Sequence, residues 1–109
     1  MSTLTVDPPA GAVPAAGGKV THTLANGGAA KVVFKVKSSN NTEYRLTPVF
    51  GFVEPGAQAP VEVTRLAGPP KEDKLVIEYG DAPADAATPQ DAFKGVAAPQ
   101  KLTVPIKAE

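Results

Sequence analysis

The segment from Lys31 to Ser39 constrains the fold more than any other part of the chain. In an extended conformation its residues alternate between two faces. One face is apolar and is formed by Val32, Phe34 and Val36. The other face carries two lysines and ends in two hydroxyl groups, through Val33, Lys35, Lys37, Ser38 and Ser39. We therefore predict a β-strand with one buried and one solvated face, and the solvated face is the best candidate surface for an acidic partner.

Shorter segments with the same alternation lie along the rest of the chain, at residues 4–6, 19–25, 44–48, 59–66, 74–79 and 100–107. The residues expected to face the core include Val20, His22, Leu24, Tyr44, Leu46, Val61, Val63, Leu75, Ile77, Tyr79, Leu102, Val104 and Ile106. In segment 74–79 the outward residues are expected to be Lys74, Val76 and Glu78. Six or seven short strands, each with one buried face, predict an antiparallel two-sheet sandwich with Greek-key connections.

The segments between these strands have turn chemistry, with 12 prolines and 10 glycines spread along the 109 residues. Residues 26–28 and 54–56 are predicted turns, and the former is expected to use positive φ angles. Residues 10–18 are expected to cover one side of a sheet as an edge excursion, and 67–73 to form a loop. A short helix is predicted from about Pro89 to Lys94, with Thr88 as its N-cap and Asp91 at position N3.

Composition excludes several classes of function. The chain has no cysteine, which excludes disulfides and thiolate zinc sites and favours an intracellular protein. The formal net charge of zero argues against nucleic-acid binding. The N-terminus does not have the pattern of a signal peptide, and no apolar run approaches the roughly 20 residues needed to span a bilayer. We expect a single domain covering residues 1–109, without membrane insertion.

No catalytic or metal-binding pattern is evident. His22 is the only histidine, and its apolar neighbours on the same face favour a partly buried, hydrogen-bonded side chain over a metal ligand. The carboxylates Glu72, Asp73, Glu78, Asp81, Asp85 and Asp91 are expected to be solvated rather than to form an acid–base pair or a calcium site. We therefore predict no enzymatic activity, no catalytic residue, no metal and no cofactor.

Five segments in succession carry a family resemblance: LTVDPP (residues 4–9), LAN (24–26), FKVKSS (34–39), YRLTP (44–48) and GFVEPG (51–56). In this order and spacing they resemble the major sperm protein domain, particularly its small sperm-specific single-domain members in nematodes. The resemblance runs over nearly the whole chain and is most specific from Phe34 to Gly56. It implies an immunoglobulin-like seven-stranded antiparallel β-sandwich without catalytic activity.

The resemblance also implies a role in protein contacts. Major sperm proteins dimerise and polymerise into the filaments that drive crawling of nematode sperm. The related domain of VAMP-associated proteins binds acidic peptides that contain phenylalanine. Its groove uses a Lys-Thr-Thr run, which corresponds here to Lys37-Ser38-Ser39, and a Lys-Phe-Met run, which corresponds to Lys74-Leu75-Val76.

In this type of sandwich the third and sixth strands are neighbours, so Val33, Lys35 and Lys37 would lie beside Lys74 and Val76. The candidate partner-binding residues are therefore Lys35, Lys37, Ser38, Ser39, Lys74 and Val76. We expect a non-enzymatic interaction domain in the cytoplasm of nematode sperm. It would associate with itself as a homodimer, with other members of the family, or with a cytoskeletal partner. The alternative is a peptide-binding adaptor that recognises acidic segments containing phenylalanine.

Overall fold

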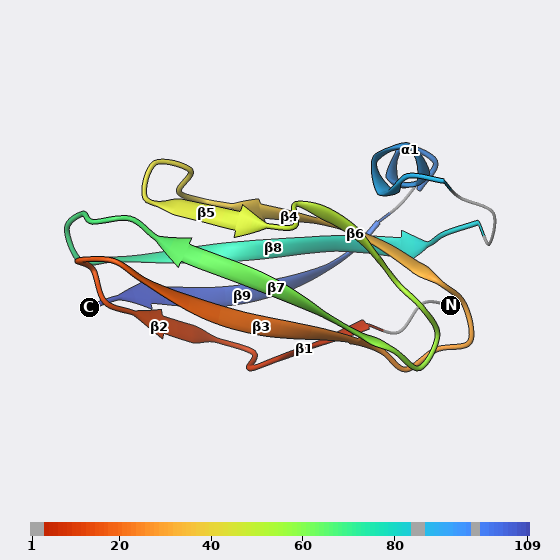
Figure 1. Cartoon of the computed structure of the whole chain (residues 1–109), viewed down its shortest axis with the longest axis horizontal. Coiled ribbons are helices and arrows are strands. Elements are labelled where there is room, and N and C mark those ends of the chain that lie inside the picture. Colours follow the sequence, from red (N-terminus) through yellow and green to blue (C-terminus); the bar gives the residue numbers. More distant parts are fainter. Residues whose placement is uncertain (1–3, 84–86, 97–98) are drawn as a thin grey trace.

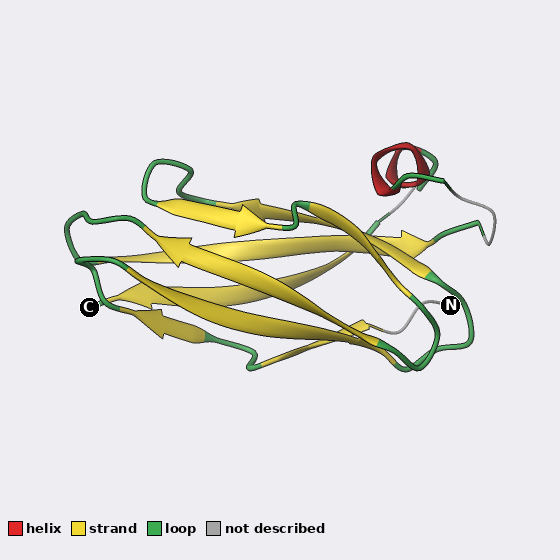
Figure 2. Ribbon diagram, viewed as in Figure 1, coloured by secondary structure: helices red, strands yellow, loops and turns green. Residues whose placement is uncertain are grey.

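A computed structural model describes residues 4–83, 87–96 and 99–109 of the chain. Two β-sheets are stacked on each other, and their strands run roughly along the long axis of an elongated molecule (Figures 1 and 2). The principal extents are 43 × 22 × 20 Å. Among the described residues one short helix is present, and it lies beside one end of the sandwich (Figure 2). The predicted all-β, two-sheet architecture is confirmed.

The four-stranded sheet contains, in spatial order, β1 (Leu4–Asp7), β3 (Gly18–Asn26), β7 (Gln58–Arg65) and β5 (Tyr44–Thr47). The five-stranded sheet contains β2 (Gly11–Val13), β9 (Gln100–Ala108), β8 (Lys71–Asp81), β4 (Val32–Ser38) and β6 (Phe50–Val53). The helix, α1, comprises Pro89–Lys94, and Thr88 caps its N-terminus by accepting a hydrogen bond from the Asp91 amide. The helix and its cap are as predicted.

The strand arrangement differs from the prediction in two respects. The described residues form nine strands instead of six or seven, and β2 pairs with β9 in parallel, so the sandwich is not entirely antiparallel. One additional strand is β6, which Pro48 separates from β5. The other is β2, which follows from Pro8 and Pro9, because these residues cannot donate ladder hydrogen bonds and they end β1. The chain then crosses to the other sheet, where part of the predicted edge excursion becomes β2. Strand β8 begins at Lys71, so the predicted 67–73 loop is shorter.

The core lies between the two sheets and is built from the inward faces of the strands. Phe34, Leu24 and Ile77 are among its largest fully buried side chains. All the inward residues predicted from alternation are buried, except that Val20, Leu46 and Leu102 are partly buried and pack against the core. Period-two alternation therefore predicted the correct inward face for the strands to which it assigned one.

Val33 lies on the outer face of β4, but it is completely buried, contrary to the prediction of a solvated position. Its cover is the α1 segment, which packs against β4 and β6. Phe93 of α1 contacts Phe50 of β6 edge to face, with ring centroids 6.0 Å apart. The segment after α1 also covers β8, because a Cβ at Gly80 would lie 2.6 Å from Val96 Cγ1. One end of this face is therefore closed.

The turn after β3 is held by a side chain rather than by positive φ angles, which among the described glycines occur only at Gly17 and Gly56. Asn26 is 2% exposed and its Nδ2 donates to the carbonyl oxygens of Ala30 (2.7 Å) and Val53 (3.0 Å). Its Oδ1 accepts a hydrogen bond from the Gly28 amide at 2.9 Å. The predicted turn is present, but the predicted backbone conformation is wrong.

Candidate functional site

Strands β4 and β8 are hydrogen-bonded neighbours, as the family resemblance implied. Lys37 lies opposite Val76 and Lys35 lies opposite Glu78, so these side chains share the outer face of the five-stranded sheet. Strand β9 extends the same face, because Thr103 lies opposite Val76 and Lys101 opposite Glu78. The central part of the candidate surface is therefore a patch that spans three adjacent strands.

Glu78 organises the charges of this patch. Its residue exposure is only 9%, and the Lys37 ammonium lies 2.9 Å from its Oε1. Lys101 Nζ lies 4.0 Å from Oε2. The hydrogen bond from Lys37 lowers the pKa of Glu78, and the charges of the nearby lysines add to this effect, while burial opposes it. The prediction of a solvated Glu78 is wrong, because the register brings lysines to it from both neighbouring strands.

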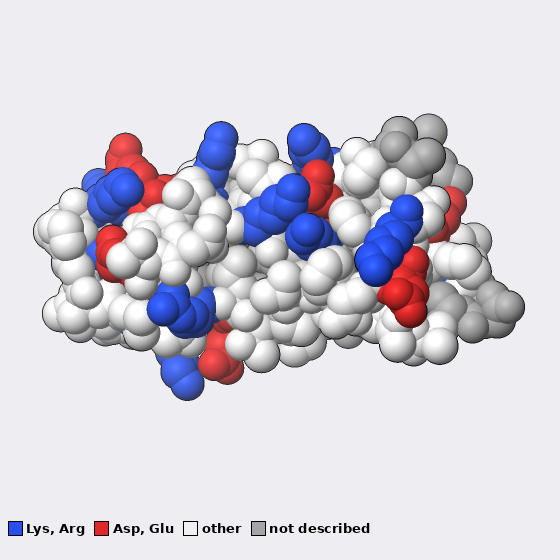
Figure 3. All heavy atoms as spheres, turned by 90° about the horizontal axis from the view of Figure 1, so that it is seen from above, with Lys and Arg blue, Asp and Glu red and all other residues white. Residues whose placement is uncertain are grey.

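Lys35 is also partly engaged. Its ammonium lies 5.4 Å from the centroid of the Phe50 ring, which is a cation–π contact. The side of the molecule that carries β5, β4 and α1 shows basic side chains along its length, with acidic side chains beside several of them (Figure 3). This mixture of charges differs from the uniformly basic surface typical of nucleic-acid binding.

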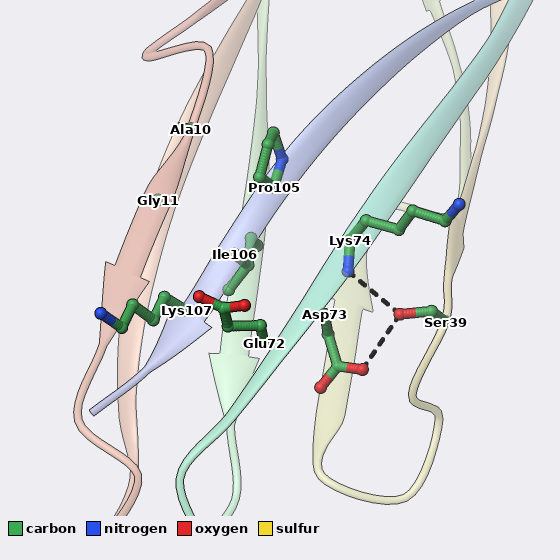
Figure 4. A pocket seen from close by; sticks show the side chains of 9 residues that line it. All are labelled: Ala10, Gly11, Ser39, Glu72, Asp73, Lys74, Pro105, Ile106 and Lys107. Carbon is green, nitrogen blue, oxygen red and sulfur yellow. Dashed lines mark hydrogen bonds between the residues drawn. The ribbon is translucent and has the colours of Figure 1, made fainter.

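Ser39 and Lys74 meet at the end of the patch farthest from α1. The Ser39 amide donates to the Lys74 carbonyl oxygen, and Ser39 Oγ accepts from the Lys74 amide, both at 3.0 Å. Ser39 Oγ also donates to Asp73 Oδ1 at 3.1 Å (Figure 4). Within the described part of the chain, the Lys74 ammonium has no ion-pair partner. Of the candidate lysines, Lys74 is therefore the most available to an acidic group.

A groove of about 700 Å³ begins at this corner and crosses β8 and β9 toward β2 (Figure 4). It is lined by Ala10, Gly11, Ser39, Glu72, Asp73, Lys74, Pro105, Ile106 and Lys107. Apolar residues form part of its floor, and side chains of both charges stand at its rim. Such a groove suits an extended segment of another protein better than a small reacting molecule.

Ser38 faces a second groove, of about 610 Å³, between β4 and β5. Its lining contains two basic residues and no acidic one, and consists of Val36, Lys37, Ser38, Asn41, Tyr44, Arg45, Leu46, Thr47 and Val49. Ser38 Oγ donates to the Asn40 carbonyl oxygen at 2.9 Å and accepts from the Asn40 amide at 3.0 Å. The structure therefore divides the six candidate residues among the central patch and two grooves.

Asn40, which is not among the residues predicted from the sequence, links the candidate residues. It is 7% exposed, and its Nδ2 donates to Glu43 Oε1 and Asp73 Oδ2, both at 3.1 Å. Its Oδ1 accepts from the amides of Thr42 at 3.0 Å and Glu43 at 3.2 Å. The Asp73 side chain is only 5% exposed as a result of these contacts and its ion pair with Lys71, so the expectation of a solvated Asp73 is also wrong. Asp85 lies outside the described residues.

His22 is 1% exposed, so it is fully rather than partly buried, and its Nδ1 lies 2.8 Å from the Pro8 carbonyl oxygen, which confirms the expected hydrogen bond. Because a carbonyl only accepts, Nδ1 carries the proton and donates it. In the described parts of the chain, no group of three His, Cys, Asp or Glu side chains is placed to hold a metal ion. None of the described helices has the length and apolarity required to cross a membrane.

Comparisons with known proteins give consistent results. The family model described as the MSP (major sperm protein) domain matches residues 3–101. Sperm-specific class P protein 10 of Caenorhabditis elegans is 59% identical over 105 residues, which cover 96% of each chain. The solved structure of SSP-19, an MSP-domain protein like family member from that nematode, is 59% identical, with a TM-score of 0.92 over 95% of this chain and 97% of that one. The structure of WR4, a C. elegans MSP family member, is 44% identical, with a TM-score of 0.92 over all of both chains.

Proposed function

The chain belongs to the major sperm protein domain family, and we propose that it is a non-enzymatic structural and interaction domain of nematode sperm. It would act in the cytoplasm by self-association or by docking to a cytoskeletal partner. The observation that carries this proposal is the 59% identity, over nearly the whole of both chains, to a relative named as sperm-specific. We also propose that the sandwich is immunoglobulin-like and has Greek-key connections.

The outer face of the five-stranded sheet supports a role in protein contacts. It places Lys35, Lys37 and Val76 on one patch and continues into the groove that begins at Ser39 and Lys74. His22 is buried and already bonded to a backbone carbonyl, so it is not presented to a substrate. The surface thus offers side chains and grooves for a macromolecule.

Light scattering and electron microscopy at increasing protein concentration test self-association. We expect reversible oligomers, and a strict monomer at all concentrations would exclude that half of the proposal.

Cosedimentation with assembled major sperm protein filaments tests docking. We expect Lys74→Glu to reduce binding, because the Lys74 ammonium has no ion pair in the described chain. Lys19→Glu is the matched control, since Lys19 is exposed on the other sheet, where it pairs with Glu62. If the two variants bind equally well, the face is not the docking surface.

A second candidate function, the peptide-binding adaptor, is favoured by one observation. The groove between β4 and β5 has basic Lys37 and Arg45, apolar Val36 and Leu46, and no acidic lining residue. An extended acidic segment with an aromatic side chain suits that combination. Titration with an acidic phenylalanine-containing peptide, followed by NMR, should shift the signals of Lys37 and Val76. If neither signal moves, this candidate is rejected.

A further inference from the structure

Strand β9 has an open edge over most of its length. It comprises nine residues, Gln100–Ala108, but β2 pairs only with its last three, Ile106, Lys107 and Ala108. Within the described ranges, no strand lies beside residues 100–105 on that side. Exposed edges of this kind are templates for pairing with another chain.

The backbone groups on this open edge can be identified. The Glu109 amide donates to the Val13 carbonyl oxygen at 3.0 Å, and the Glu109 carbonyl oxygen accepts from Ala15 at 2.9 Å. Glu109 therefore points its backbone groups toward β2. Because backbone groups alternate between the two sides of a strand, those of Thr103 and Lys101 point the same way, where none of the described strands covers them.

Two further features limit which strand can pair with this edge. The backbone of Pro105 faces the same side as those of Lys101 and Thr103, but proline has no N–H. The backbone donors and acceptors available on the open edge are therefore those of Lys101 and Thr103. Leu102 lies between them on the inward face and is only partly buried against the core. A strand added at this edge would satisfy the backbone groups and cover the exposed part of Leu102.

We propose that this open edge pairs with the same edge of a second copy of the chain. The two β9 strands would be antiparallel, with the two-fold axis passing beside Leu102. This inference rests on the proposed function, because it specifies how self-association occurs. The interface is isologous, since each copy contributes the same segment.

The geometry favours this register. Lys101 lies opposite Thr103 of the partner subunit, and Thr103 opposite the partner subunit's Lys101, so each copy uses both free N–H groups and both free carbonyls. The two copies of Leu102 meet on the inward face. No like charges lie directly opposite each other, and each Lys101 lies 4.0 Å from Glu78 of its own chain. A register centred on Thr103 would instead place Lys101 opposite Pro105, which lacks a donor.

Substitution at Thr103 tests the interface. Thr103→Pro removes the open-edge N–H without removing a hydrogen bond within the described chain, and Thr103→Ala is the control that retains the N–H. Each dimer would lose two of its four inter-chain hydrogen bonds. In sedimentation equilibrium we expect a dissociation constant at least roughly tenfold weaker for Thr103→Pro, and within about twofold of wild type for Thr103→Ala.

The outcomes separate this inference from the proposed function. If wild type dimerises and folded Thr103→Pro dimerises equally well, this interface is wrong, while self-association stands. If wild type remains monomeric at millimolar concentration, both this interface and self-association are excluded. Circular dichroism establishes whether the proline variant is folded.

Amide hydrogen exchange of the wild-type protein gives a result that does not depend on any variant. We expect the Lys101 and Thr103 amides to exchange rapidly in dilute solution and to become protected as the dimer forms. The Leu102 and Val104 amides, which point toward β8, should be protected at every concentration. Absence of protection in the dimer would overturn the interface. Protection already present in the dilute monomer would also overturn it, because another segment of the same chain would then occupy the edge.

Discussion

Replacing Asn40 by alanine should destabilise the protein far more than the same change at its neighbour Asn41. The Asn40 side chain makes four hydrogen bonds, to Glu43, Asp73 and the backbone of the following turn. Asn41 is exposed, and its only described polar role uses the backbone carbonyl, which accepts from Arg45 and survives substitution. The two variants therefore compare the same chemical change with and without the network.

The size of the effect follows from the bonds that are lost. A hydrogen bond of this type contributes a net of about 0.5–1.5 kcal/mol, and four would give at most about 6 kcal/mol. Water can replace part of this in a turn at the surface, so we expect the Asn40→Ala substitution to lower the free energy of unfolding by about 2–4 kcal/mol. The Asn41→Ala control should remain within about 0.5 kcal/mol of wild type.

Urea unfolding followed by circular dichroism measures both variants, and the slope with denaturant should stay the same while the midpoint shifts. NMR provides a second measurement, since the amide signals of Ser39 and Lys74 should move only in Asn40→Ala, because Asp73 links them to Asn40. If Asn40→Ala is as stable as Asn41→Ala, the hydrogen-bond network of Asn40 does not hold this corner of the candidate surface.

Three further predictions concern other positions. Gly51→Ala should lower the free energy of unfolding by about 1–3 kcal/mol in urea, because its Cβ would lie 2.6 Å from Cζ of buried Phe34. The pKa of Glu78 is lowered in the folded state, so its carboxylate contributes stability above the ordinary pKa of 4.5, which is lost as pH falls through the folded value. Acid titration of Glu78→Gln should therefore show a smaller loss of stability than that of wild type. Tyr44→Phe should leave thermal stability unchanged or raised, because the buried Tyr44 hydroxyl has no hydrogen-bond partner among the described residues; a clear decrease would contradict this. Burial raises the pKa of Tyr44, so a pH above 10, where tyrosine ionises in the unfolded chain, should lower the stability of wild type more than that of Tyr44→Phe.

Local patterns predicted much of the fold, because strand alternation and helix capping depend on residues close in sequence. The inward positions of Val61, Val63 and Ile77 follow from period two alone. The cap at Thr88 follows from the spacing to Asp91. These features need no knowledge of which strands become neighbours.

The remaining features depend on contacts between distant segments. Val33 was expected to be solvated because nothing in its own strand indicates that α1 will lie over it. Glu78 is buried among lysines that come from β4 and β9, more than 20 residues away in either direction. Asn40 reaches Asp73 across a similar separation in sequence. Alternation predicted that the candidate side chains share a face, but not which of their charges are already paired.

The pairing of these charges bears on how the chain makes contacts. At one end of the outer face α1 covers Val33, and in the middle Glu78 already balances Lys37 and Lys101. Lys37 and Lys101 are thus already engaged by a carboxylate, whereas the Lys74 ammonium has no ion-pair partner within the described chain. The open edge of β9, in contrast, presents backbone groups whose pairing does not depend on net charge. Because salt screens exposed charges and hardly affects backbone pairing, self-association through that edge should persist at high ionic strength, whereas docking through Lys74 should weaken.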